Sequence, residues 1–272
     1  MSIQDFAGKH RLLFSYKYTW APIDKGYNNR TLYVNVGTGE IKEKPVSAFM
    51  KEKFTGGKGF GLRLLWDAVT PATRWNDPEN EIVINTGPIC GITQYSGTGK
   101  SLVVTISPQT DIPVDSNVGG YFGPFLKFAG FDSLELQGKA EKDVIVFVDE
   151  TREVIEIYEA GTEALDSHLL AEYLTETLAE TEKDRVNVSV VSAGSAADHS
   201  LIGMLNFSFF DTRRKVVRLK QAGRGGIGTV LRDKKIKAVV AHSKGVTGNR
   251  NNVVDLQAIM ERGKTFNREM RE

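Results

Sequence analysis

The sequence predicts an α+β fold built from two similar β-rich halves with short helices. Segments with strand character do not alternate one-to-one with helical segments, as they would in a doubly wound parallel sheet. A glycine-containing pattern occurs twice along the chain. The composition, with 40% hydrophobic and 25% charged residues among 272, is that of a globular protein rather than a disordered or fibrous one.

The predicted strands are short runs rich in β-branched and aromatic residues. We expect them at residues 31–36, 39–45, 81–87, 101–107, 133–138, 143–149, 153–159, 186–194, 215–220 and 237–242. The Gly-Thr-Gly sequence at 37–39 lies between the first two of these strands and is typical of a hairpin turn.

Helices are predicted where apolar residues recur every three or four positions. These segments cover residues 46–54, 59–69, 123–130, 162–180, 227–235 and 253–270. The segment 162–180 is acidic and is predicted to be a surface helix whose apolar face is formed by Leu165, Leu169, Tyr173, Leu174 and Leu178.

The internal repeat consists of a strand, a gap, a glycine cluster, a short helix and a second strand. Its first copy contains the strand 81–87, the cluster GGYFG at 119–123 and the strand 133–138. Its second copy contains the strand 186–194, the cluster GGIG at 225–228 and the strand 237–242. We therefore expect two similar sub-structures related by a rough two-fold axis, each with a glycine-rich edge that can approach a ligand closely.

Charge is balanced overall but unevenly distributed. The net charge of +1 gives no indication of a nucleic-acid or anionic membrane partner. Residues 149–184 hold twelve acidic and two basic side chains, whereas residues 212–237 hold ten basic and one acidic. The basic segment contains AGRGGIG at 222–228, where free backbone N–H groups and cations together favour a bound anion. A solvated basic strand and loop is the alternative interpretation.

No apolar run approaches the roughly 18 residues that a membrane span needs, and the first residues lack the apolar core of a signal peptide. We expect a cytoplasmic protein without a membrane or nucleic-acid partner. The one cysteine, Cys90, excludes an internal disulfide and any Cys-only cluster site within this chain. We expect it to be a small buried hydrophobic residue.

Several short motifs suggest other activities but lack essential residues. TGKS at 98–101 ends like a phosphate-binding P-loop, yet Gln94 stands where the motif requires its first glycine. Residues 223–228 satisfy G-x-G-x-x-G, but no acidic residue follows at the distance that a dinucleotide ribose requires. The four histidines share no metal-ligand spacing. Asp198 and His199 have serines nearby, but no G-x-S-x-G elbow is present.

Six blocks form the most specific pattern in the chain. They are VNVGTGEIKE (34–43), FTGGKGFGLRLLWD (54–67), NEIVINTGPICGIT (80–93), LVVTISPQT (102–110), NVGGYFGPFLKFAGFDSLELQGKAEK (117–142) and AGRGGIGTVLRDKKIKAV (222–239). In order and spacing they resemble the N-terminal domain of aldehyde ferredoxin oxidoreductases, from residue 31 to about 245. The resemblance implies a two-halved base for a tungsten or molybdenum bis-pyranopterin cofactor, in enzymes that also carry a [4Fe-4S] cluster.

The resemblance also implies a set of cofactor-binding residues: Lys100, Asn117, Gly119, Gly120, Gln221, Ala222, Gly223 and Arg224. The backbone carbonyls of Asn117 and Ala222 would bind a Mg²⁺ ion that bridges the pterin phosphates, in keeping with the preference of Mg²⁺ for oxygen ligands. The glycines would contact phosphate through N–H groups, and Arg224 through its guanidinium fork. Lys100 stands where the family commonly has arginine, so it keeps the charge without the bidentate geometry.

By the same resemblance, the chain consists of an N-terminal extension (1–30), the pterin-binding domain (31–245) and a C-terminal helix or start of a linker (246–272). In the family, the cluster cysteines and the acid and base groups lie in later domains, so no catalytic residue is expected here. We expect a cofactor-binding subunit or fragment of an oxidoreductase that interconverts aldehydes and carboxylic acids, or related acyl substrates. A second polypeptide would carry the cluster and catalytic groups, and a ferredoxin-like carrier would take the electrons. A non-catalytic pterin-binding or interaction module is the alternative.

Overall fold

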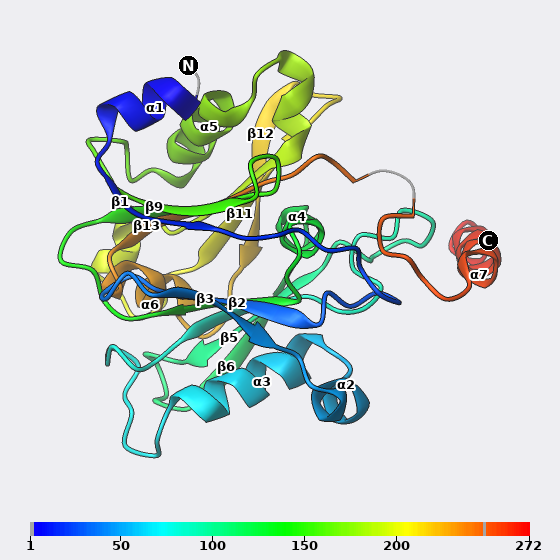
Figure 1. The fold of residues 1–272 in the computed structure, drawn as a ribbon, viewed down its shortest axis with the longest axis horizontal. Coiled ribbons are helices and arrows are strands. Elements are labelled where there is room, and N and C mark those ends of the chain that lie inside the picture. The colour runs from blue at the N-terminus through cyan, green and yellow to red at the C-terminus, as the bar shows by residue number, and fades with distance from the viewer. Residues whose placement is uncertain (1–2, 247–248) are drawn as a thin grey trace.

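Two mixed β-sheets lie face to face in the computed structural model, with helices between them and on their outer faces (Figure 1). The structure describes residues 3–246 and 249–272. Residues 1–2 and 247–248, which fall in the predicted N-terminal extension and C-terminal segment, lie outside the described residues. The α+β prediction is confirmed.

The six-stranded sheet has the order β3-β2-β7-β4-β5-β6. The bounds of these strands, in that order, are Ile41–Pro45, Arg30–Asn35, Ser133–Gln137, Ile82–Asn85, Ser101–Ile106 and Pro113–Val118. The seven-stranded sheet has the order β1-β9-β8-β13-β10-β11-β12. Its bounds, again in order, are Leu12–Lys17, Val154–Glu159, Val144–Asp149, Ile236–His242, Val188–Ser192, Leu205–Asp211 and Val216–Ala222.

Apart from β1, the two sheets have the same topology. Strands β2 to β7 of the first half correspond one by one to β8 to β13 of the second. In each sheet one pair is parallel, β2 with β7 and β8 with β13, and the other corresponding pairs are antiparallel. The repeat therefore covers whole half-domains, and is longer than the glycine clusters and flanking strands that indicate it in the sequence.

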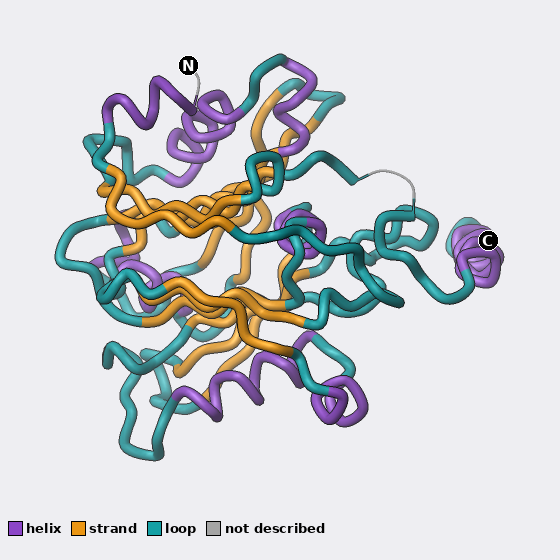
Figure 2. Tube along the Cα trace, viewed as in Figure 1, coloured by secondary structure: helices purple, strands orange, loops and turns teal. Residues whose placement is uncertain are grey.

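Two short helices lie between the sheets, and each contacts the sheet of the other half as well as that of its own (Figure 2). Helix α4 (Phe122–Phe128) contacts β10 and β13, and α6 (Ile227–Asp233) contacts β4 and β5. All seven residues of α4 are buried. One core cluster, which includes Phe125, Leu126 and Leu231, therefore joins both halves, and each large apolar side chain in it contributes roughly 1.5–3 kcal/mol.

Helices also cover the outer faces of the two sheets (Figure 1). Helices α2 (Ala48–Phe54) and α3 (Gly57–Ala68) pack on the six-stranded sheet, and α1 (Ile3–Lys9) and α5 (Ser167–Leu178) on the seven-stranded sheet. The 3-10 helices are Glu182–Asn187 and Ser195–Asp198. Within the described ranges, no helix is both long enough and apolar enough to cross a bilayer.

The predicted apolar face of the acidic helix is wrong at two positions: Leu165 lies before the helix begins at Ser167, and Leu169 points away from the sheet. Helix α5 buries Leu170, Leu174 and Leu178, whereas Leu169 is 57% exposed. Asp166 caps the helix by accepting hydrogen bonds from the N–H groups of residues 168 and 169. The four-residue spacing of the buried leucines then points Leu169 to solvent.

Helix α7 (Leu256–Glu269) lies apart from the layered body, alongside the loop that precedes β5 (Figure 1). Its N-cap is Asp255, whose side chain accepts a hydrogen bond from the N–H of Ala258. Gly263 is its one buried residue among those described, and Phe266 stacks on Tyr95 with ring centroids 5.5 Å apart.

Candidate functional site

Two glycine loops meet where the edge strands β6 and β12 pack together. The first glycine loop is residues 119–121, directly after β6, and the second is residues 223–226, directly after β12. The N–H of Arg224 donates to Ser116 Oγ at 3.3 Å, and Ser107 Oγ donates to the carbonyl of Gly225 at 2.9 Å. Serines of the first half thus hold the glycine loop of the second.

A hollow lies beside each loop. The first hollow, of about 520 Å³, is lined by residues that include Gly97, Gly99, Gly120, Tyr121, Phe209 and Lys220. The second hollow, of about 620 Å³, is lined by residues that include Ser107, Val114, Met204, Gly223, Arg224 and Gly226. In each case the glycine loop comes from one half of the fold and the facing hairpin from the other.

The first glycine loop has an open backbone. Gly119 and Gly120 have nothing within 4 Å of the position that a Cβ atom would take. Gly120 has a φ of +114°, which favours glycine, but packing within the described residues does not require glycine at 119. By contrast, a Cβ on Gly123 would lie 2.7 Å from Ser101 Oγ. The open surface at 119–120 is what close approach of a ligand to the backbone requires.

Backbone donors in both loops are free. The N–H groups of Gly119, Gly120 and Gly223 donate no hydrogen bond to any residue in 3–246 or 249–272. Buried or semi-enclosed donors without a partner are costly unless water or a ligand accepts from them. Consecutive free N–H groups form an anion-binding arrangement.

Three cations near the loops also have no ion-pair partner among the described side chains: Lys100, Lys220 and Arg224. Arg224 lines the second hollow and Lys220 the first. Lys100 is exposed just before β5 but is not part of either lining. Lys100 and Arg224 were among the predicted site residues, whereas Lys220 was not singled out within the basic segment 212–237.

The remaining predicted residues occupy equivalent strand ends. Asn117 on β6 is exposed and pairs with Leu102, and Ala222 on β12 is buried and pairs with Leu205. Gln221 is exposed and its Nε2 donates to Asn206 Oδ1 at 3.4 Å. The structure therefore places the predicted set at one junction between the halves, except for Lys100, which lies at the edge of it.

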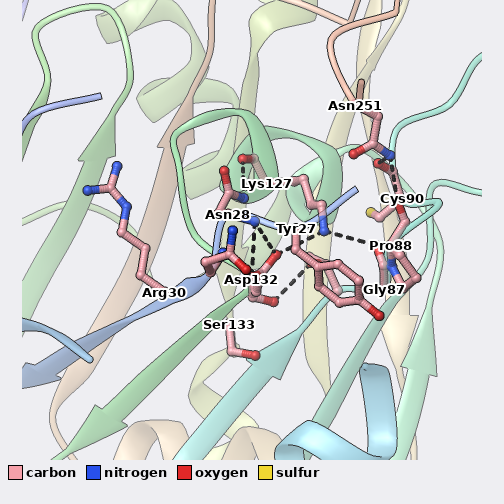
Figure 3. A network of polar contacts seen from close by, with 12 residues as sticks. Tyr27, Asn28, Arg30, Gly87, Pro88, Cys90, Lys127, Asp132, Ser133 and Asn251 are labelled. Atoms are coloured by element: carbon pink, nitrogen blue, oxygen red, sulfur yellow. Dashed lines mark hydrogen bonds and ion pairs between the residues drawn. The ribbon is translucent and has the colours of Figure 1, made fainter. Parts of the chain in front are cut away.

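A buried polar network supports the loop at 87–90 (Figure 3), which leads into the lining of the first hollow at Gly91. Lys127 Nζ donates to Asp132 at 2.9 Å and to the carbonyl of Gly87 at 3.1 Å, and both charged side chains are at most 2% exposed. The backbone N–H of Asn28 also donates to Asp132. The side chain of Asn251 donates to the carbonyls of residues 88 and 90. Segments from both ends of the chain therefore hold the loop at 87–90.

Cys90 lies in this supported loop and is buried, as predicted. Burial raises the pKa of its thiol to about 12, so the thiol is neutral near pH 7. Its S–H donates to the carbonyl of Lys100 at 3.7 Å. Across residues 3–246 and 249–272, no three His, Cys, Asp or Glu side chains are grouped in a way that could hold a metal ion.

Each hollow combines glycine N–H groups with a cation that has no ion-pair partner among the described side chains, which suits an anionic ligand. A comparison with known protein families matches residues 31–243 to the family described as "Aldehyde ferredoxin oxidoreductase, N-terminal domain". The chain belongs to this family. The resemblance drawn from the six sequence blocks is confirmed.

Curated relatives are more than twice as long as this chain. The tungsten-containing aldehyde ferredoxin oxidoreductase of Pyrococcus furiosus is 35% identical over 214 residues, which cover 77% of this chain and 32% of the relative. The Pyrococcus horikoshii enzyme is 33% identical over 217 residues, 79% of this chain and 33% of the relative. A Pyrococcus furiosus protein named "Aliphatic sulfonate oxidoreductase, WOR-like subunit" is 30% identical over 229 residues. The chain thus spans about a third of these relatives.

A solved structure also has this fold. It is titled "Active site complex BamBC of Benzoyl Coenzyme A reductase in complex with 1,5 Dienoyl-CoA", and it superimposes with a TM-score of 0.68 at 27% identity. The match covers 80% of this chain and 31% of the other.

Proposed function

We propose that this chain is the cofactor-binding part of a tungsten (or molybdenum) pterin oxidoreductase that interconverts aldehydes and carboxylic acids, or related acyl substrates. The observation that carries the proposal is the pair of hollows, each built from a glycine loop with free N–H groups and an unpaired cation. Two similar hollows across one junction suit two pterins attached to one metal. The membership of the family supports the same ligand.

The residues present would hold the cofactor through its phosphate groups. Free N–H groups of Gly119, Gly120 and Gly223 would donate to phosphate oxygens, and Arg224 would add a guanidinium fork. Strand-end carbonyls of Asn117 and Ala222 would face a bridging Mg²⁺. When bound, the cofactor would supply the redox chemistry, in which oxidation of an aldehyde to a carboxylic acid takes up one water and releases two electrons and two protons.

A second polypeptide or further domain would complete the active site. The chain covers about a third of its curated relatives, and the similar solved structure is by its title a complex. Tyr121, Ile202 and Met204, which flank the two hollows, are 45%, 67% and 48% exposed. Apolar side chains around an open site favour coverage by protein, which would exclude water from the metal. We propose that this partner carries the [4Fe-4S] cluster and passes electrons to a ferredoxin-like protein.

Within this proposal, residues 31–245 form the pterin-binding domain. Residues 1–30 would be an extension that adds α1 and β1, and residues 246–272 would connect this domain to the partner.

Anaerobic co-expression with the product of the adjacent reading frame tests the proposal. We expect purified protein to contain tungsten or molybdenum together with iron, and to reduce viologen when an aldehyde is added. Arg224→Ala should lower the metal content, because it removes the cation of the second hollow, whereas Arg213→Ala, in the exposed β11–β12 turn, should not. Metal-free protein in every preparation would instead support a non-catalytic module.

A further inference from the structure

We infer that Lys220, together with the rings of Tyr121 and Phe209, forms a ring-and-phosphate binding site in the first hollow. The ligand class is a flat heteroaromatic ring with a phosphate-bearing side chain. The inference rests on the proposed function and deepens it. It gives the phosphate-binding role to Lys220, which lies on a strand of the second half, whereas the glycine loop of this hollow comes from the first half.

The aromatic part is built from two elements. Tyr121 follows Gly120 in the first glycine loop and stacks on Phe125 of α4, with centroids 5.8 Å apart and planes 17° apart. Its ring centroid lies 6.5 Å from that of Phe209 on β11. Tyr121 is 45% exposed although its ring is held by this stacking. A fixed, partly exposed aromatic surface beside an open glycine backbone suits a planar ring.

The charge is placed beside this surface. Lys220 lies on β12, and its Nζ is 5.7 Å from the centroid of the Phe209 ring. Arg218, two residues earlier on the same strand face, pairs with Asp211 at 3.2 Å. No carboxylate among the described residues pairs with Lys220. An ammonium group without an internal partner at the wall of a hollow is available to a phosphate.

The second hollow has no equivalent of this site. Lys220 lies two residues before Ala222, and the residue two before Asn117 on the corresponding strand is Asp115. Asp115 is paired with Lys58 at 2.7 Å. The two hollows therefore differ in chemistry despite their common topology, and the first holds its ligand through Lys220 where the second uses Arg224.

The test compares anaerobically purified full-length variants, co-expressed with the adjacent reading frame, for bound pterin. Pterin is released by oxidation and measured by fluorescence after a wash in 0.5 M NaCl. We expect Lys220→Met to retain about tenfold less pterin than the parent, since it loses a charge-assisted contact. Lys220→Arg and Tyr121→Phe should retain parental levels, and Tyr121→Ala should lose pterin.

Lys17→Met is the matched control, because Lys17 lies on β1 at the opposite edge of the same sheet and its loss changes the net charge equally. Parental pterin retention in Lys220→Met would overturn this inference and leave the proposed function intact. Absence of pterin from every protein, the parent included, would overturn both. If Lys220→Arg lost as much pterin as Lys220→Met, the result would also count against a charge contact and would indicate a structural role for Lys220.

Discussion

Lys127 is a buried charge in a hydrogen-bond network that joins three separate segments. Its ammonium group is bonded to Asp132 and to the carbonyl of Gly87, and the N–H of Asn28 reaches the same carboxylate. A buried pair is expensive to desolvate, but breaking it by removing one partner leaves an uncompensated charge. Through the carbonyl of Gly87, Lys127 holds the loop that leads into the lining of the first hollow at Gly91.

We predict that Lys127→Met lowers the free energy of unfolding by roughly 3–5 kcal/mol, measured by guanidinium titration. The double variant with Asp132→Asn should recover part of this loss, because the unpaired carboxylate is gone. Lys53→Met, which removes an exposed lysine, is the control and should change stability little. A loss below about 1 kcal/mol in Lys127→Met would show that the pair is not what holds these segments.

Glu81 gives a pH-dependent prediction. Its side chain is buried, and Oε2 has no hydrogen-bond partner. Burial, followed by the charge of Glu135, raises the pKa of Glu81 from 4.5 to about 8. The folded protein therefore keeps a proton that the unfolded chain releases above pH 4.5. The stability that depends on this proton is fully present below pH 4.5 and is lost as pH rises through about 8.

Glu81→Gln should therefore be about as stable as the parent near pH 4.5, and more stable by roughly 2–4 kcal/mol above pH 8. Thermal unfolding followed by circular dichroism from pH 4.5 to 8.5 measures this difference. Glu79→Gln, at an exposed neighbouring position, should show no such trend. Parallel stability curves for the parent and Glu81→Gln would contradict a buried neutral carboxyl.

Among the elements, α7 buries a single described residue, Gly263, against the loop at 94–98. A Cβ on Gly263 would lie 2.1 Å from the backbone carbonyl oxygen of Gln94. Gly263→Ala should therefore detach the helix from the loop at 94–98, although alanine favours helix formation. Hydrogen exchange should then increase in both α7 and this loop. Lys264→Ala, on the exposed face, is the control, and unchanged exchange in Gly263→Ala would mean that the helix is held elsewhere.

Elements with strong apolar patterns could be predicted from the sequence, and three strands could not. Strand β6, PVDSNV, is an edge strand and carries polar residues, so its sequence lacks the apolar pattern by which the other strands were predicted. It was missed although the first glycine loop follows it directly. Strand β11, LNFSFFD, has no clean alternation because it is buried on parts of both faces. Strand β1 becomes a strand only by pairing with β9, a contact that no local pattern encodes.

At the scale of the whole molecule, duplication explains both what could be predicted and what was missed. The glycine clusters indicated two similar halves, and the structure shows six corresponding strands in each. The sequence could not show that each hollow combines a loop of one half with a hairpin of the other. Phe209 and Lys220 were missed for that reason, since their role depends on the packing of β12 against β6.

The central claim is that the two hollows hold two pterins of one cofactor. The most direct measurement is the molar ratio of pterin, phosphorus and tungsten or molybdenum to this chain in the anaerobically purified complex. Our account predicts two pterins and one such metal for each copy of the chain. A single pterin per chain, or pterin bound equally well after Gly119→Val and Gly223→Val together, would contradict it.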